Sequence, residues 1–219
     1  MTDKHRRFLG PVVEMRKLHD SAEQRIVHSA EMLDRKSLAS VGDTTGERLT
    51  ALLTETKAHT PEELAANVAR IGELLGRFAL YVPARFTDDP AEQAKYWAVR
   101  SGIFPAVGGS RPAGTTCLSE DVAFHIEDLP RATAELQALI ARHGYDACIY
   151  GHALEDNYHF IINQSFSPPA EVARYEALMN DVAELVSAGT TARSKPSMAR
   201  GATWRPSSAA SRATTPWPS

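Results

Sequence analysis

The sequence predicts an α+β domain in which an antiparallel sheet carries helices on one face. A first observation is that strand-like, helix-like and strand-like runs follow one another over residues 49–86, and again over residues 116–153. A second is the apolar run at residues 158–164, which follows a short polar stretch and predicts a hairpin. Repeated strand–helix–strand units are typical of a ferredoxin-like layout.

The N-terminal part contains one helix with clear end signals. Residues 1–29 are charged, with irregular apolar spacing, and predict an irregular or helical segment. Residues 49–57 alternate between polar and apolar side chains and predict a strand. The helix predicted over residues 61–78 has Thr60 as its N-cap and Pro61 at its first position. A strand therefore leads directly into a well-defined helix.

The middle of the chain completes the first unit and adds a helix. Residues 79–86 predict the second strand of that unit. Asp89 then begins a helix that carries Trp97 and Arg100. A loop rich in Gly and Pro is expected over residues 105–114.

The last part contains the second unit and the hairpin. Residues 116–126 predict a strand, residues 128–141 a helix, and residues 146–153 and 158–164 two strands joined by a tight turn. An amphipathic helix over residues 167–186 follows.

Composition excludes several classes of protein. A chain of 219 residues that is 43% hydrophobic can bury the core of one domain. The net charge of −3 gives no overall attraction to nucleic acid, and no apolar run reaches the roughly 20 residues of a membrane span. Cys117 and Cys148 are too few for a disulfide framework. We expect a cytoplasmic protein that binds no nucleic acid.

Two histidines, His152 and His159, flank the predicted hairpin turn. If residues 155–156 form a two-residue turn, the histidines lie opposite each other with Cβ atoms roughly 5 Å apart. Two imidazoles at this separation suit a divalent cation, with a carboxylate as third ligand. Asn157 would hold a ligand or cofactor group by a hydrogen bond. The alternative is that the histidines only fill polar positions at a sheet edge.

Three passages carry a resemblance to a known family: residues 82–111, 114–124 and 151–160. They resemble the C-terminal domain of FAD-linked D-2-hydroxy-acid dehydrogenases, the D-lactate dehydrogenase and glycolate oxidase group. The resemblance implies that His152 and His159 bind a divalent metal, zinc in our expectation, which holds the substrate beside the flavin. Asp156 stands where the family has glycine, so we expect slight strain in the turn.

The same resemblance suggests residues that bind the substrate. Arg100, in the Trp97-Ala98-Val99-Arg100 step, would bind the substrate carboxylate, and Arg111 is a second candidate. An ion pair at the surface is the alternative for each arginine. Adjacent residues of a strand face opposite ways, so Glu120 and Asp121 are interpreted as structural.

Parts of the family pattern are missing from this sequence. Too few residues precede residue 30 for a flavin-binding domain, so hydride transfer to FAD is not expected of this chain alone. The family's third metal ligand and general base come from a Glu-His-Gly-Thr-Gly-Arg segment after the last helix. That segment is absent, and we therefore assign no catalytic residue.

A basic tail stands in its place. Residues 188–219 carry cations, no acids, and abundant Ala, Ser, Thr and Pro, a composition typical of disorder. Reading the codons one base over permits the missing Glu-His-Gly-Thr-Gly-Arg segment, so we infer a frameshift near Ala188. Residues 30–187 are then the substrate- and metal-binding domain.

The leading hypothesis is a fragment of an FAD-dependent oxidoreductase that oxidises a D-2-hydroxy acid such as D-lactate, inactive by itself. The alternative is a non-catalytic ferredoxin-like binding or assembly module, or a subunit that complements a separate flavin domain. Loss of a flavin domain would expose apolar surface, so self-association is also expected.

Overall fold

The computed structural model describes residues 3–20, 25–42 and 50–191. It contains one five-stranded sheet of order β2-β1-β4-β5-β3, in which every neighbouring pair is antiparallel. The strands are β1 (Ser29–Leu33), β2 (Ala51–Glu55), β3 (Thr116–Ala123), β4 (Cys148–His152) and β5 (Asn157–Gln164). The helices are α1 (Asp3–His19), α2 (Arg35–Ser40), α3 (Pro61–Leu75), α4 (Pro90–Gly109), α5 (Leu129–Arg142) and α6 (Pro169–Thr191), and a short 3-10 turn, η1 (Ala153–Glu155), links β4 to β5.

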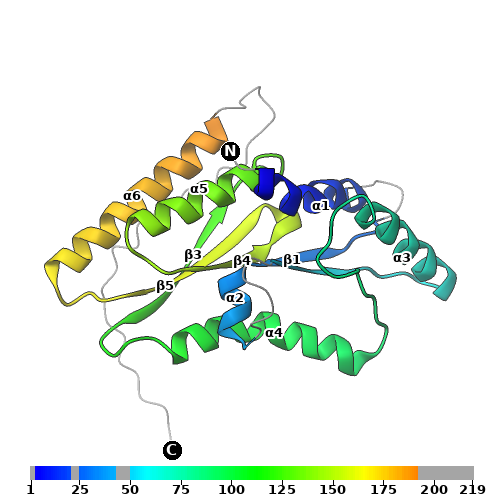
Figure 1. Cartoon of the computed structure of the whole chain (residues 1–219), viewed down its shortest axis with the longest axis horizontal. Helices are drawn as coiled ribbons and strands as arrows, with labels where there is room; N and C mark the ends of the chain where they lie inside the picture. The colour runs from blue at the N-terminus through cyan, green and yellow to red at the C-terminus, as the bar shows by residue number, and fades with distance from the viewer. Residues whose placement is uncertain (1–2, 21–24, 43–49, 192–219) are drawn as a thin grey trace, which may run out of the picture.

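Helices cover both faces of the sheet, unequally (Figure 1). The larger core joins one sheet face to α1, α3, α5 and α6, with side chains such as Met15, Ile71, Leu136 and Leu178. A smaller core on the other face joins Leu38 of α2 and Ile103 of α4 to the sheet. The α+β class and the antiparallel sheet are confirmed. The expected placement of all helices on one face holds for four of them, whereas α2 and α4 lie on the other.

The second predicted strand–helix–strand unit is present. Strands β3 and β4 both pair antiparallel with β5, so they run parallel to each other on either side of it. Helix α5 connects them, and its apolar side chains pack into the larger core. The hairpin strand β5 is thereby inserted between the two strands of the unit.

The first unit is not formed, because residues 79–86 contain no strand. Leu80, Tyr81 and Val82 are exposed, so their β-forming side chains have no sheet to pack on. Pro83 also lacks the backbone N–H that a central strand needs. The segment instead connects the end of α3 to the start of α4.

Helix boundaries follow the capping signals closely and the loop signals less well. The Thr60 hydroxyl accepts a hydrogen bond from the Glu63 backbone N–H at 3.2 Å, as predicted for α3. Helix α4 continues through Pro105 to Gly109, where a loop was expected, since its buried Ile103 packs against the sheet. No helix in the described ranges is long and apolar enough to cross a membrane.

The final helix extends beyond its predicted end. Helix α6 ends at Thr191, so residues 188–191 belong to it and not to a disordered tail. The remainder of the tail, which contains the inferred frameshift segment, lies outside the described residues.

Candidate functional site

Polar side chains gather on the sheet face that carries α2 and α4. Alternation along each strand puts Tyr150 and His152 of β4 on this face with Leu33, Cys148 and Ile161 of the smaller core. His159 of β5 lies on the same face, because it pairs with Tyr150 on one side and with Asp121 on the other. These residues therefore lie on four neighbouring strands of the sheet.

The two histidines are close, although not in the predicted register. Tyr150, and not His152, is opposite His159. The reason is the connection: η1 and Asp156 form a four-residue link in place of the expected two-residue turn. Because side chains alternate along a strand, this two-residue shift in the pairing register leaves each side chain on the predicted face of the sheet. The rings of His152 and His159 consequently lie 5.7 Å apart between centroids, nearly perpendicular to each other.

Each histidine has a carboxylate partner on its Nδ1 atom. Glu31 of β1 is directly opposite His152, and its Oε1 lies 2.5 Å from His152 Nδ1. Asp121 of β3 contacts His159 Nδ1 in the same way. A carboxylate accepts a hydrogen bond from Nδ1–H, and in the neutral form of each ring the lone pair is then on Nε2.

Arg100 of α4 joins this group through Glu31. Its Nε donates to Glu31 Oε2 at 3.0 Å, and its guanidinium lies 4.9 Å from the centroid of the Tyr150 ring. The Glu31 side chain is 4% exposed, so this is a nearly buried ion pair. Burial raises the pKa of the Tyr150 hydroxyl, although the positive charge of Arg100 acts to lower it. The predicted Arg100 is thus brought to the histidine pair.

Arg111 is not brought to the pair. Its Nη1 donates to the Gly108 carbonyl at 2.6 Å and its Nε to the Thr115 carbonyl at 3.1 Å. Thr115 directly precedes β3, and Asp121 lies six residues further on, which is roughly 20 Å along a strand. In this structure Arg111 fastens the end of α4 to the start of β3.

Asn157 lies at the start of β5, two residues before His159, so the two side chains are on the same face of the sheet. Its Oδ1 atom is buried and has no hydrogen-bond partner among the described residues. A buried acceptor of this kind is costly unless a donor satisfies it. The position therefore fits a donor group from a bound molecule.

The sequence analysis did not predict two residues that contact the histidines, Asp121 and Glu31. Glu120 and Asp121 do face opposite ways, since Glu120 accepts a hydrogen bond from the Tyr175 hydroxyl at 2.6 Å on the other face. Asp121 contacts Nδ1 of His159, a contact that the sequence did not predict. Glu31 carried a readable signal: it is an acid within the apolar run Ala30-Glu31-Met32-Leu33, which indicates a buried carboxylate that needs a partner.

The two histidines offer at most two of the ligands that a metal site needs. Across residues 3–20, 25–42 and 50–191, no group of three His, Cys, Asp or Glu side chains is placed to hold a metal ion. A third ligand would have to come from outside the described residues or from a bound molecule.

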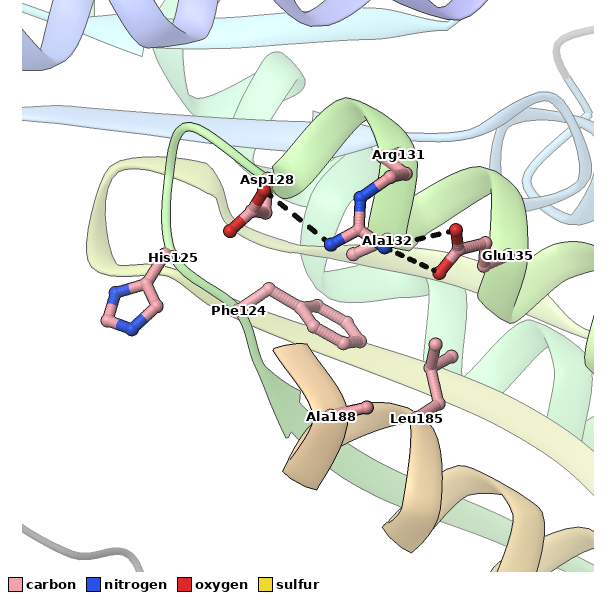
Figure 2. A pocket seen from close by; sticks show the side chains of 8 residues that line it. All are labelled: Phe124, His125, Asp128, Arg131, Ala132, Glu135, Leu185 and Ala188. Atoms are coloured by element: carbon pink, nitrogen blue, oxygen red, sulfur yellow. Dashed lines mark hydrogen bonds and ion pairs between the residues drawn. The ribbon is translucent and has the colours of Figure 1, made fainter. Parts of the chain in front are cut away.

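A small cavity of about 110 Å³ lies on the other face of the sheet, between α5 and α6 (Figure 2). Phe124 and Leu185 form its apolar wall. Arg131 lines it as well, but its guanidinium is paired with Asp128 and Glu135. The cavity is separate from the histidine pair, and three of the polar side chains that line it, Asp128, Arg131 and Glu135, are paired with one another.

Comparison with known proteins identifies a family and several solved structures with a similar fold. The family model described as FAD linked oxidases, C-terminal domain, matches residues 15–190. A solved structure of 4-ethylphenol oxidase from Gulosibacter chungangensis, in complex with isoeugenol, is similar with a TM-score of 0.50 and 12% sequence identity. The match covers 86% of this chain and 42% of that chain, so the present chain spans less than half of the oxidase. No curated protein matches in sequence.

Proposed function

Because the chain belongs to the family of FAD-linked oxidase C-terminal domains, we propose that it is the substrate-binding part of an FAD-dependent oxidoreductase that oxidises a D-2-hydroxy acid, such as D-lactate. One observation carries the proposal. A single buried carboxylate, Glu31, contacts both His152 and Arg100, so the residue proposed to bind a cation and the residue proposed to bind an anion lie side by side.

This arrangement matches the chemistry of a 2-hydroxy acid. Such a substrate carries a carboxylate and a hydroxyl on neighbouring carbon atoms. Arg100 uses its Nε for Glu31, and the terminal nitrogens of its guanidinium have the fork geometry that binds carboxylates. The hydroxyl would then point toward the histidine pair.

The residues present fit two ligands of a divalent metal, zinc in our proposal. A carboxylate on the Nδ1 of a ligating histidine is the usual support for metal binding through Nε2, and both His152 and His159 have one. When bound, the metal would polarise the substrate hydroxyl. Its third ligand is not among the described residues.

FAD, when bound, supplies the hydride-accepting chemistry. Oxidation removes a hydride from the α-carbon and a proton from the hydroxyl, which leaves a 2-oxo acid. The task of this chain in the proposal is to bind and orient the substrate through Arg100. The unpaired Asn157 Oδ1 would accept a hydrogen bond from the cofactor or substrate. Arg111 could contribute to binding only if the loop that holds it moves.

A non-catalytic assembly module, or a subunit that complements a separate flavin domain, is the second candidate. Trp97 and Phe104, three and four residues from Arg100 on the same side of α4, are both more than one-third exposed. Exposed aromatic side chains beside a site are typical of a surface that another domain covers.

Calorimetric titration of the zinc-loaded protein with D-lactate tests the proposed substrate. We expect D-lactate to bind more tightly than L-lactate, and both more tightly than propionate, which has the carboxylate but no hydroxyl. Replacement Arg100→Ala should weaken the binding of all three acids, because it removes the group proposed to bind their common carboxylate. Equal, weak binding of all three acids would contradict the hydroxy-acid proposal and favour the assembly module.

A further inference from the structure

Glu31 holds two functional groups at once, in a way that no other carboxylate of the described site does. Asp121 contacts only His159 among the site residues, and its side chain is 66% exposed. Glu31 is 4% exposed, and each of its oxygens has a different partner, His152 on one side and Arg100 on the other. Both partners lie far from it in the sequence, 121 and 69 residues away.

We propose that Glu31 is the positioning residue of the site: it fixes the His152 ring with Nε2 directed away from the strand that carries Glu31, and it sets the spacing between His152 and Arg100. The metal and substrate parts rest on the proposed function, whereas the orientation of the ring does not. Glu31 is a positioning residue, because it contacts neither a substrate nor a cofactor itself.

The hydrogen-bonding capacity of each group supports this assignment. An ionised carboxylate only accepts hydrogen bonds, and an arginine only donates them. With Arg100 on Oε2, Oε1 must receive its hydrogen from His152, so in the neutral ring the proton is on Nδ1 and the lone pair is on Nε2. The opposite tautomer would place two acceptors 2.5 Å apart, which is strongly unfavourable.

The backbone restrains Glu31 as well. It lies in the middle of β1, which pairs with β2 at Leu53 and with β4 at His152. Because β1 is paired on both sides, its backbone fixes the position from which the Glu31 side chain extends. The separation between the anion site and the histidine nitrogen is therefore set by β1, as a substrate with neighbouring carboxylate and hydroxyl groups requires.

Nitrogen NMR of the histidine rings in the unmodified chain tests the assignment without metal, flavin or substrate. At a pH where imidazole is neutral, we expect His152 to be protonated on Nδ1. In Glu31→Gln, the side-chain amide can itself donate to Nδ1, so the Nε2-protonated tautomer should gain population while His159 stays unchanged. Asp121→Asn is the matched control, and it should affect His159 alone.

Zinc affinity, measured by competition with a fluorescent chelator, gives a second and independent readout. Loss of an outer-shell partner typically weakens metal binding roughly 10- to 100-fold, and we expect Glu31→Gln to lie in this range. Asp121→Asn should lose less, because its carboxylate is largely exposed. A melting curve for each variant shows whether it is folded.

The outcomes separate this inference from the proposed function. If His152 in the unmodified chain is protonated on Nε2, the positioning role is wrong, and this result needs no variant to fold. If the tautomer responds to Glu31→Gln but wild-type protein binds no zinc, Glu31 still orients the ring and the metal part of the proposed function fails. Unchanged tautomer and unchanged zinc affinity in a folded Glu31→Gln variant would also overturn the inference.

Discussion

The carboxylate of Asp156 lies 3.4 Å from a guanidinium nitrogen of Arg16, so the turn between the two histidine strands is tied to helix α1. Arg16 also donates to the Leu154 carbonyl at 2.5 Å. Asp156 has a φ of 61°, the left-handed conformation that glycine adopts without strain. The ion pair with Arg16 therefore offsets part of the strain of a non-glycine residue at this position.

Replacement of Asp156 tests this balance. Asp156→Ala keeps the left-handed strain and loses the ion pair, so the free energy of unfolding should fall by about 1 kcal/mol. Asp156→Gly loses the pair but relieves the strain, and it should be close to wild type. Urea denaturation gives the order, and Arg16→Gln in each background isolates the pair. Equal stability of the Ala and Gly variants would show that the left-handed conformation of residue 156 is not strained.

Gly151 controls how closely β4 approaches β5. A Cβ atom at this position would lie 2.7 Å from the Asn157 carbonyl oxygen and 2.9 Å from the Tyr158 Cα, both of them backbone atoms. We expect Gly151→Ala to push the strands apart, with a loss of at least 1 to 3 kcal/mol in unfolding free energy and weaker zinc binding. Gly72→Ala, where the new Cβ has no neighbour within 4 Å apart from the local backbone of α3, is the control. Wild-type stability of Gly151→Ala would show that the close approach is not maintained.

The pH dependence of stability should contain a contribution from Asp34. Burial raises the pKa of this carboxyl, although hydrogen bonds from Ser37 oppose the shift. A carboxyl whose pKa is raised on folding adds stability below its unfolded pKa, and this contribution is lost as the pH rises through the folded pKa. Lys36 and Cys148 are the other titratable groups close to it.

Asp34→Asn keeps the N-cap of α2, because an amide oxygen can also accept from the Ser37 N–H, at 2.8 Å in the wild type. The variant should be more stable than wild type at neutral pH, and the difference should vanish in acid. Unfolding free energies measured in urea from acid to neutral pH would show it. Asp89→Asn is the control: it makes the same change at the N-cap of α4, where the carboxylate is exposed and its charge is not buried on folding. A constant difference between Asp34→Asn and wild type at every pH would count against the assignment.

The exposed aromatic side chains of α4 should cause self-association. Only Ile103 among its 20 residues is buried, whereas Tyr96, Trp97 and Phe104 are all more than one-third exposed. Sedimentation velocity at increasing concentration should show larger species, and Trp97→Ser with Phe104→Ser should shift the protein toward monomer. Val172→Ser, on the exposed start of α6, should not. A wild-type protein that stays monomeric at high concentration would remove the support for a covered surface on α4.

Local signals predicted the fold where a residue and its partner are close in sequence. Thr60 and Pro61 gave the start of α3, and the apolar runs around His152 and His159 gave a hairpin with both histidines on one face. The register was wrong by two residues, since the four-residue link and the left-handed Asp156 are not evident from residue types. Residues 79–86 do not form the expected strand, because side chains that favour strands do so only beside a neighbouring strand, and the tertiary fold supplies none there.

The most important omission was Glu31, and its cause is the distance along the chain. No periodicity links residue 31 to residues 100 and 152, because the contact arises only when β1 pairs with β4. Arg100, by contrast, was found through a resemblance in its neighbouring residues. The sequence thus pointed to His152, His159 and Arg100, which the structure brings together, but not to Glu31, which contacts two of them.

The pairing of β1 with β4 also has a consequence for the order of folding. His152 and His159 belong to one hairpin and can approach each other after a short loop closes, whereas Glu31 must close a loop of 121 residues to reach His152. During synthesis, β1 and β2 leave the ribosome long before β4 exists. The site is therefore completed late, and until then one edge of β1, with its carboxylate, has no strand to pair with.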